Sequence, residues 1–422
     1  PSAPQGDNRI PAGIRALLLA SFFSAFAQIG QITIIGKQVF DMTGSTLNLG
    51  LLGLAEFLPV ALLSPITGSV ADRFDRRKVF AGALVGEALV SVLLFLYVWS
   101  DPSSILPIFG LVLLFGVFRA SASPASRALP IDLAPPGVLE RVVALRTFSF
   151  MAGAIVGPVA LGFVFVGGVA LPYLVAAGGF AAAIAVLTLV PRPPVRQHRP
   201  TGARQVVRDA FEGLRFIRRT PIVFGAISLD LFAVLFGGVI ALLPAIAEER
   251  LGVGAVGLGW LRAAVGIGAA GTALTLSIRP LRRHVGRRLL AMVAMFGILT
   301  IVLGFTRSFA MAFIALLAAA AVDAVSMFIR ASLVPLATPE AMRGRVLAVE
   351  NVFIGASNEL GAFESGVTAA LFGLVGAIFF GGAGTLVVVA LWWKFFPALR
   401  SVDRFEEVRS TSTSDDNGET PS

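Results

Sequence analysis

Nine ionisable side chains interrupt long apolar segments of this 422-residue chain. They are Glu56, Glu87, Arg119, Asp230, Arg262, Asp323, Glu350, Glu359 and Glu364. A charged group at the centre of a bilayer costs about 2.5–3.5 kcal/mol on insertion scales, so each of these residues is a candidate for function. The chemistry that they offer is reversible protonation of a carboxyl group and charge pairing with arginine.

Other kinds of chemistry find no support in the residues. The chain has no cysteine, which excludes disulfides, thiolate catalysis and cysteine metal sites. Its two histidines, His198 and His284, stand among arginines in predicted loops, and there is no metal-ligand spacing, phosphate-binding loop or nucleophile elbow. We therefore predict that the protein is not an enzyme, that it needs no cofactor or metal, and that it does not use ATP.

The composition is that of an integral membrane protein. Hydrophobic residues make up 56% of the chain and charged residues 14%, whereas a soluble protein carries roughly 25% charged residues. We predict an all-α protein with twelve transmembrane helices, each longer than the roughly 17 residues that cross the hydrocarbon core. The predicted spans lie near residues 13–36, 46–70, 78–99, 104–131, 142–165, 168–190, 221–246, 254–278, 289–307, 309–334, 346–372 and 374–396.

The positions of lysine and arginine predict the orientation of these spans. Of the 34 Lys and Arg residues, only Lys37, Arg250 and Arg307 fall in external loops if the N-terminus is cytoplasmic. Apart from three arginines inside spans, all the others lie on or beside cytoplasmic segments. We therefore expect both termini in the cytoplasm, and we assign the net charge of +9 to topology rather than to nucleic-acid binding.

A long cytoplasmic segment near residue 200 divides the chain into six spans plus six. Its second part places Val207, Ala210, Phe211, Leu214 and Ile217 on one helical face, which predicts an amphipathic helix at the membrane surface. The expected organisation is a cytoplasmic tail (1–12), a six-helix bundle (13–190), a linker with the amphipathic helix (191–220), a second six-helix bundle (221–397) and a disordered cytoplasmic tail (398–422).

The two halves repeat one another. The stretch APPGVLERVVAL (134–145) aligns with TPEAMRGRVLAV (338–349), and the same alignment places Arg119 opposite Asp323. Upstream, FDRRKVF (74–80) aligns with VGRRLLA (285–291). Repeated halves joined by a linker are typical of secondary transporters, which alternate access around a site near the middle of the membrane.

Two motifs resemble signatures of the major facilitator superfamily. The stretch GSVADRFDRR (68–77) is similar to the loop 2–3 signature Gly-x-x-x-Asp-Arg-x-Gly-Arg-Arg, with Gly68, Asp72, Arg73, Arg76 and Arg77 in place. Asp75 stands where the signature has glycine, and its role is not evident from the pattern.

The second motif, GAIVGPVALG (153–162), resembles the span-five antiporter signature through Gly153, Gly157, Pro158 and Gly162, although Leu161 replaces one glycine. The stretches TPEAMRGRV and GLRFIRRTP further resemble the bacterial enterobactin-exporter and drug-efflux branch of the superfamily. The resemblance implies two pseudo-symmetric six-helix bundles.

The loop 68–77 is expected to act as a conformational latch. Asp72 can accept hydrogen bonds from a helix N-terminus, and the resemblance implies that this helix is span eleven. Arg76 can pair with Asp132 at the inner end of span four. Such a cluster would hold the two halves together on the cytoplasmic side. The alternative is that these charges only set topology.

The resemblance also implies that spans one, four, seven and ten face a central cavity. That implies cavity positions for Gln28, Gln31, Arg119, Asp230 and Asp323. We hypothesise that Asp230 or Asp323 binds the coupling proton and that Arg119 faces Asp323 across the cavity. The alternatives are a static ion pair between Asp323 and Arg330, which share a helix face, and a structural hydrogen bond of Asp230.

Span eleven carries the widest polar face. Glu350, Ser357 and Glu364 repeat every seven residues, and Asn358 belongs to the adjacent stripe. Such a face cannot point at lipid, so it either lines the cavity, with Asn358 and Glu364 as candidates, or packs against another helix. Glu359 lies off this face and has no assigned partner, and Glu87 is expected to be structural.

Together these features predict a monomeric transporter of the inner membrane that exports a small organic molecule, drug-like or siderophore-like, in exchange for protons. Its partners would be that molecule, protons and the lipid bilayer. A lysophospholipid or lipid flippase of the same fold is one alternative. A membrane receptor or scaffold that transports nothing is another, although a scaffold gains nothing from the cost of buried charges.

Overall fold

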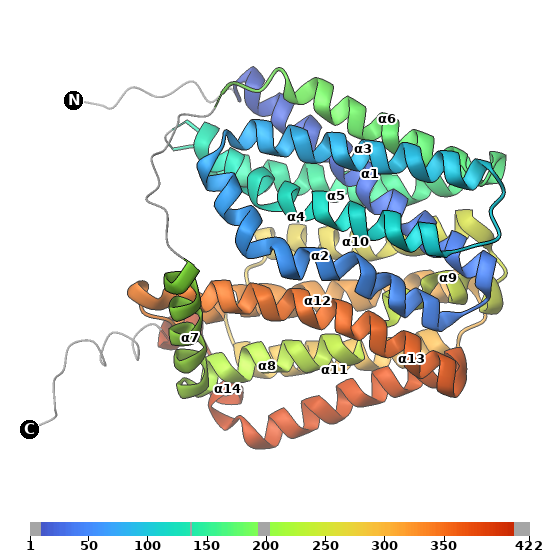
Figure 1. The fold of residues 1–422 in the computed structure, drawn as a ribbon. Helices are drawn as coiled ribbons and strands as arrows, with labels where there is room; N and C mark the ends of the chain where they lie inside the picture. Colours follow the sequence, from blue (N-terminus) through green and yellow to red (C-terminus); the bar gives the residue numbers. More distant parts are fainter. Residues whose placement is uncertain (1–9, 136, 193–202, 409–422) are drawn as a thin grey trace, which may run out of the picture. The chain divides into compact units, whose positions relative to one another are not determined.

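The structure is a computed structural model that describes residues 10–135, 137–192 and 203–408; the side chains of residues 64–66, 68–73 and 203–207 lie outside this description. The described chain is built of helices and short connections (Figure 1). Helices suit the apolar surroundings because each one satisfies its backbone N–H and C=O groups within its own segment. The chain forms two compact units: unit 1 comprises Pro1–Ile35 and Leu58–Arg199, and unit 2 comprises Gly36–Phe57 and Pro200–Ser422.

Unit 1 is built around α3, which packs against both α4 and α6. Its core includes Phe115 of α4 and Phe180 of α6, whose ring centroids lie 6.1 Å apart. The helices of the first half are α1 (Ala12–Thr43), α2 (Thr46–Arg73), α3 (Arg76–Trp99), α4 (Leu106–Leu133), α5 (Leu139–Gly167) and α6 (Leu171–Leu187), and the ends of α1 and α2 nearest their connecting turn belong to unit 2.

Unit 2 contains two apolar cores, one around Leu242, Leu258 and Leu316 and the other around Ile227, Leu289 and Val346. Within it, α10 packs on α12, and α13 packs on both α8 and α11. Its further elements are α7 (Ala203–Arg219), α8 (Pro221–Phe236), η1 (Gly238–Leu242), α9 (Leu243–Ala245), η2 (Ile246–Arg250), α10 (Gly254–Ile278), α11 (Val285–Phe305), α12 (Phe309–Leu336), α13 (Glu340–Phe395) and α14 (Pro397–Ser401).

The helices confirm the predicted fold class of an all-α membrane protein. Among the described residues, ten segments are long and apolar enough to cross a membrane. One of them, the 56-residue α13, divides into two helices at Gly373, where φ is 74° and only glycine is unstrained. The 17 residues of α6 are about the minimum that crosses the hydrocarbon core. These two elements account for the remaining predicted spans.

The predicted amphipathic helix is α7, which lies crosswise at one end of α8 and α12 and packs against α13 (Figure 1). Arg345 of α13 pairs with Asp209 at 3.0 Å and with Glu212 at 2.8 Å. These ion pairs turn the acidic edge of α7 toward α13. Ile217 is buried in unit 2 while Phe211 is 68% exposed, and the position of α7 at the membrane surface stays a prediction.

The structure describes the segment after α13 as far as Val408. Leu399, Val402 and Val408 are buried in the second apolar core of unit 2. The predicted disordered tail 398–422 is therefore wrong for residues 398–408, because apolar side chains anchor them, and residues 409–422 lie outside the described part. The N–H of Gly286 donates to the carbonyl of Val402 at 3.0 Å, which ties this segment to the start of α11.

Replacing Asp403 by Ala should loosen residues 397–408 from α11. The N–H of His284 donates to Asp403 Oδ1 at 3.0 Å, and this bond lowers the pKa of the Asp403 carboxyl below its usual 3.8. A carboxyl with a lowered pKa stabilises the folded state above its usual pKa, and this contribution is lost as the pH falls through the lowered value. We expect faster amide hydrogen exchange at His284 in the variant at neutral pH.

The exposed Glu406 provides a matched control through Glu406→Ala, which should leave the exchange at His284 unchanged. The difference between Asp403→Ala and the wild type should vanish at a pH where Asp403 is protonated. Equal exchange in both variants at neutral pH would contradict this role of Asp403.

Candidate functional site

The loop between α2 and α3 is held within unit 1 by three polar contacts. Arg76 Nη1 donates to Asp132 Oδ2 at 2.7 Å, and the Asp132 side chain is only 3% exposed. Asp75 accepts the backbone N–H of Arg77 at 2.9 Å, so it caps the N-terminus of α3. The Arg77 guanidinium donates to the carbonyl of Val190 beyond α6. Asp75, which the family pattern does not explain, therefore has a structural role.

The rest of the predicted latch falls on the end of α2. The backbone of Gly68, Asp72 and Arg73 is helical, but their side chains lie outside the described part of the structure. The pairing of Arg76 with Asp132 is present, whereas the contact of Asp72 with span eleven stays a prediction.

The glycines of the antiporter-like motif lie where α5 crosses α1. A Cβ at Gly153 would lie 2.3 Å from the carbonyl oxygen of Phe22, and one at Gly157 would lie 2.2 Å from that of Phe26. Pro158 and Gly162 are buried in the same helix. The motif thus serves close helix packing inside unit 1, which small residues permit in membranes.

The two glutamines of α1 occupy different environments. Gln31 is fully buried, and its Oε1 accepts the Ser91 hydroxyl of α3 at 2.6 Å, so it joins helices within unit 1 rather than lining a cavity. Gln28 is half-buried, as is Arg119 of α4. Because Arg119 belongs to unit 1 and Asp323 to unit 2, the contact between them stays a prediction.

In unit 2, Asp230 of α8 forms an ion pair with Arg330 of α12. Their side chains are only 10% and 9% exposed. The alternative of a static pair between Asp323 and Arg330 is wrong. Seven residues span two helical turns, or about 10 Å along the axis, so the two side chains are too far apart on α12.

Asp323 lines a cavity of about 90 Å³ between η1, α10, α11 and α12. The other walls are apolar, with Ile240, Phe296 and Leu316 among them, except for Thr300. Within the described part of unit 2, the Asp323 carboxylate forms no hydrogen bond and no ion pair. It is therefore available to a proton or to a cation.

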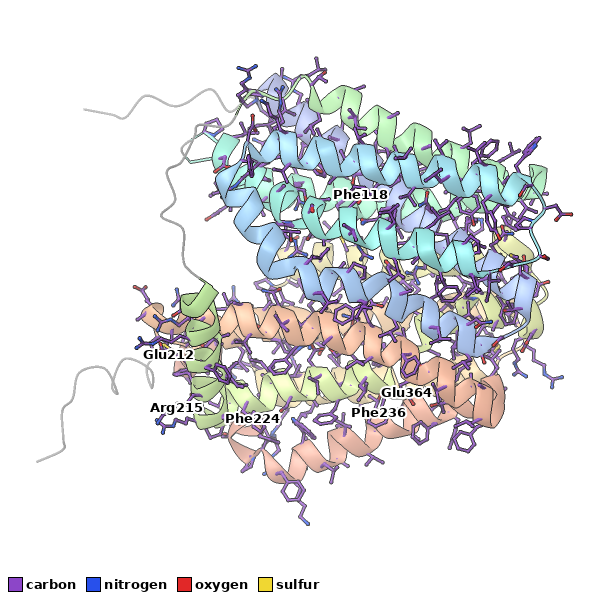
Figure 2. All side chains as sticks on the ribbon, viewed as in Figure 1. Phe118, Glu212, Arg215, Phe224, Phe236 and Glu364 are labelled. Carbon is purple, nitrogen blue, oxygen red and sulfur yellow. The ribbon has the colours of Figure 1, made fainter. Side chains whose placement is uncertain are left out.

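The polar face of α13 divides between two environments. Ser357 is buried, whereas Asn358 is exposed and its amide donates to a carbonyl of its own helix. Glu364, labelled in Figure 2, is half-buried and accepts the Thr368 hydroxyl at 2.7 Å and the Ser365 hydroxyl at 3.4 Å. One edge of this face therefore packs inside unit 2, and the lining of a cavity by Asn358 and Glu364 stays a prediction.

The seventh span is interrupted, which the sequence predictions missed. α8 ends at Phe236, and the chain continues as the 3-10 helix η1, the short α9 and the π-helix η2. A Cβ at Gly238 would lie 2.1 Å from the carbonyl oxygen of Gly361, so η1 approaches α13 closely. The pair Gly237–Gly238 and the following Pro244 are the sequence signal for this interruption. Interrupted spans of this kind mark binding sites in transporters. The same η1 lines the cavity of Asp323.

The sequence predictions also missed the place of Lys37. Because α1 continues to Thr43, Lys37 is helical rather than part of a loop, and it is only 5% exposed in unit 2. Its ammonium pairs with Asp41 and lies 3.1 Å from Glu248 of η2. This pairing ties the end of α1 to the irregular part of the seventh span.

The sequence profile of the Major Facilitator Superfamily matches residues 17–307, more than half of the chain. The chain belongs to the major facilitator superfamily. It is therefore a multi-pass membrane transporter and not an enzyme. It is 28% identical over 411 residues to the enterobactin exporter EntS of Escherichia coli O1:K1 and to that of Shigella boydii serotype 18, with 95% of each chain covered.

Solved structures of other transporters share the fold. A POT family transporter in complex with 5-aminolevulinic acid matches 94% of this chain and 98% of its own, with a TM-score of 0.73 and 13% identity. A bacterial homologue of the human lysosomal transporter Spinster matches 98% of this chain and 100% of its own, with a TM-score of 0.68 and 17% identity. At such low identity these structures show only that the fold is shared.

Substituting Gly157 by Ala should force α5 away from α1, because the added methyl group has no room beside Phe26. Overpacking of this kind costs about 1–3 kcal/mol, so we expect a lower thermal unfolding midpoint of the purified protein in detergent. Gly178 of α6 offers a matched control, since a methyl group added there would meet no neighbouring element within 4 Å. Gly178→Ala should be neutral or stabilising by about 0.5–1 kcal/mol. Equal midpoints for the two variants would refute the packing role.

Proposed function

We propose that this secondary transporter exports a small organic molecule, either a drug-like compound or a siderophore-like metabolite, in exchange for protons. The observation that carries the proposal is Asp323, an acid without a protein partner in the described part of unit 2 on the wall of an apolar cavity. An acid inside the membrane is costly unless it serves transport, and a carboxyl group can take up and release the coupling proton.

The direction of transport is supported by the relatives. The curated proteins that resemble the chain over 95% of its length are called enterobactin exporters, which favours efflux of a small metabolite. A proton that moves inward across 100 mV releases about 2.3 kcal/mol, enough for roughly 50-fold accumulation of an uncharged substrate. One coupled proton is thus sufficient for useful export.

The proposal places the transporter in the inner membrane as a monomer that works by alternating access. The distribution of Lys and Arg supports a cytoplasmic location of both termini. In this orientation the loop between α2 and α3 lies on the cytoplasmic side, where Arg76 and Asp132 hold its shape for the latch residue Asp72.

The proposal is tested in proteoliposomes with an imposed pH gradient and a pH-sensitive dye in the lumen. Addition of a panel of cationic, neutral and catecholate compounds should move protons for at least one class of compound. Asp323→Asn should abolish this coupled movement. Asp101→Asn, the same change in the exposed loop after α3, should leave it intact.

Two outcomes would overturn the proposal. If no compound moves protons, the coupling is wrong, and movement of a fluorescent lysophospholipid in the same vesicles would then favour a flippase. Equal coupling in Asp323→Asn and the wild type would remove Asp323 from the mechanism.

The latch has its own test. Asp72→Asn keeps the size of the side chain but removes its charge, so we expect normal membrane insertion and loss of transport. Insertion is measured by the yield of monodisperse protein in detergent, and transport by export of the substrate found in proteoliposomes. Wild-type transport in Asp72→Asn would leave the loop only a role in topology.

A further inference from the structure

Three charged side chains from three helices are buried together in unit 2. Counted over the whole residue, Asp230 of α8 and Arg330 of α12 are each 8% exposed, and Glu350 of α13 is 9% exposed. Leu229 and Ile329, the residues next to Asp230 and Arg330 in the sequence, belong to the second apolar core and have no exposed surface. Glu350 lies ten residues into α13, or about 15 Å along the helix, so the cluster is well inside the bundle.

The two acids do not share Arg330 equally. The guanidinium of Arg330 forms its ion pair with Asp230 and donates through Nε to the carbonyl of Ser326 at 3.4 Å. Glu350 is close enough to Arg330 to interact with its charge, but its side chain forms no hydrogen bond within the described residues. Arg330 thus forms an ion pair with Asp230, whereas Glu350 interacts with it only through its charge.

The charges in this cluster do not balance. Two carboxylates against one guanidinium leave one negative charge in excess in an apolar core. Such an uncompensated charge is strongly unfavourable in a low dielectric, and one proton removes it. The proton belongs on the acid that lacks an ion pair, which is Glu350.

Within the described part of unit 2, no other charge compensates Glu350 from the helices packed against α13. The interior of α8 contributes only Asp230, and η1 contributes no charged residue. Arg330 is the charged group that acts on Glu350. The remaining charged residues of the packed elements lie toward the helix ends or further along. They are Glu56 on the part of α2 that belongs to unit 2, Arg208, Asp209, Glu212, Arg215, Arg218 and Arg219 of α7, Arg287 and Arg288 of α11, Asp323 of α12, Glu340, Arg343, Arg345, Glu359, Glu364 and Lys394 of α13, and Arg400 of α14.

We propose that Glu350 is a proton-binding residue of the transport cycle and that Arg330 is its positioning residue. With a proton on Glu350, the acid is neutral and Asp230 holds Arg330. When Glu350 releases the proton, its carboxylate competes with Asp230 for the guanidinium, which draws α13 and α12 together. Glu350 binds one proton and releases the same proton in each cycle. This deepens the proposed function, since it assigns a second proton-binding acid, besides Asp323, to the proposed exchange.

The first test measures the proton itself, without substrate or gradient. A buried protonated carboxyl group absorbs in the infrared at a carbonyl-stretch frequency distinct from that of a carboxylate. Purified wild-type protein should show such a band at neutral pH that Glu350→Gln lacks; Glu87 and Asp323 are present in both proteins, so the difference spectrum of wild type minus Glu350→Gln isolates Glu350. Asp230→Asn should lack it as well, because Glu350 then becomes the sole anion of Arg330 and gives up its proton.

Glu340→Gln is the matched control, since it makes the same change at an exposed position in the first turn of α13. It should keep the band. A difference spectrum of wild type minus Glu350→Gln without the band would overturn the assignment. Unfolding midpoints of all variants in detergent establish that each is folded.

The second test measures coupling in proteoliposomes. Glu350→Gln resembles the permanently protonated acid, so transport driven by a pH gradient should be lost while exchange of substrate at equal concentrations on both sides continues. Gradient-driven transport at the wild-type rate in Glu350→Gln would refute the coupling role. A wild-type protein with the infrared band but without any proton-driven transport would refute the proposed exchange and leave the proton site in place.

Discussion

An unpaired charge or polar group is costly in hydrocarbon, and this cost determines where the polar residues of the chain lie. Arg330 is neutralised by Asp230, and the amide of Gln31 accepts the hydroxyl of Ser91. Each contact joins two helices of one unit, so the polar residues also fix how those helices pack. Asp323 differs, because it lines a cavity and forms no ion pair or hydrogen bond within the described part of unit 2.

Apolar packing alone cannot specify contacts between helices in a membrane, because lipid tails are as apolar as leucine. Close approach of backbones provides the missing specificity in both units. Gly157 brings α5 onto α1 at Phe26, and Gly238 brings η1 onto α13. The second contact occurs where the seventh span is irregular, so the interruption is held in place by its neighbour. Because η1 is held in this way, it can form a wall of constant shape for the cavity that Asp323 lines.

Much of the fold was predictable because the signals are long and repetitive. Apolar segments, loop charges and the repeated halves predict the helical membrane fold, and complementary charge in matching loops predicts the pair of Arg76 and Asp132. The environment of a single side chain was harder to predict, because a span that lines a cavity with one side still buries the residues of its other side within its own bundle. Gln31 is an example. The direction in which α7 presents Phe211 depends on ion pairs with Arg345, which no local pattern reveals.

The two copies of the loop motif have diverged in a specific way. Asp75 and Gly286 occupy the same position in the aligned repeats, yet Asp75 uses its side chain to cap α3, whereas Gly286 has no room for one beside the carbonyl oxygen of Leu399. Each copy also holds the chain that follows the last span of its half, at Val190 through a guanidinium and at Val402 through a main-chain N–H. The halves are therefore no longer interchangeable: a chimera that carried either loop in both places would lose a helix cap in one half or meet a steric clash in the other.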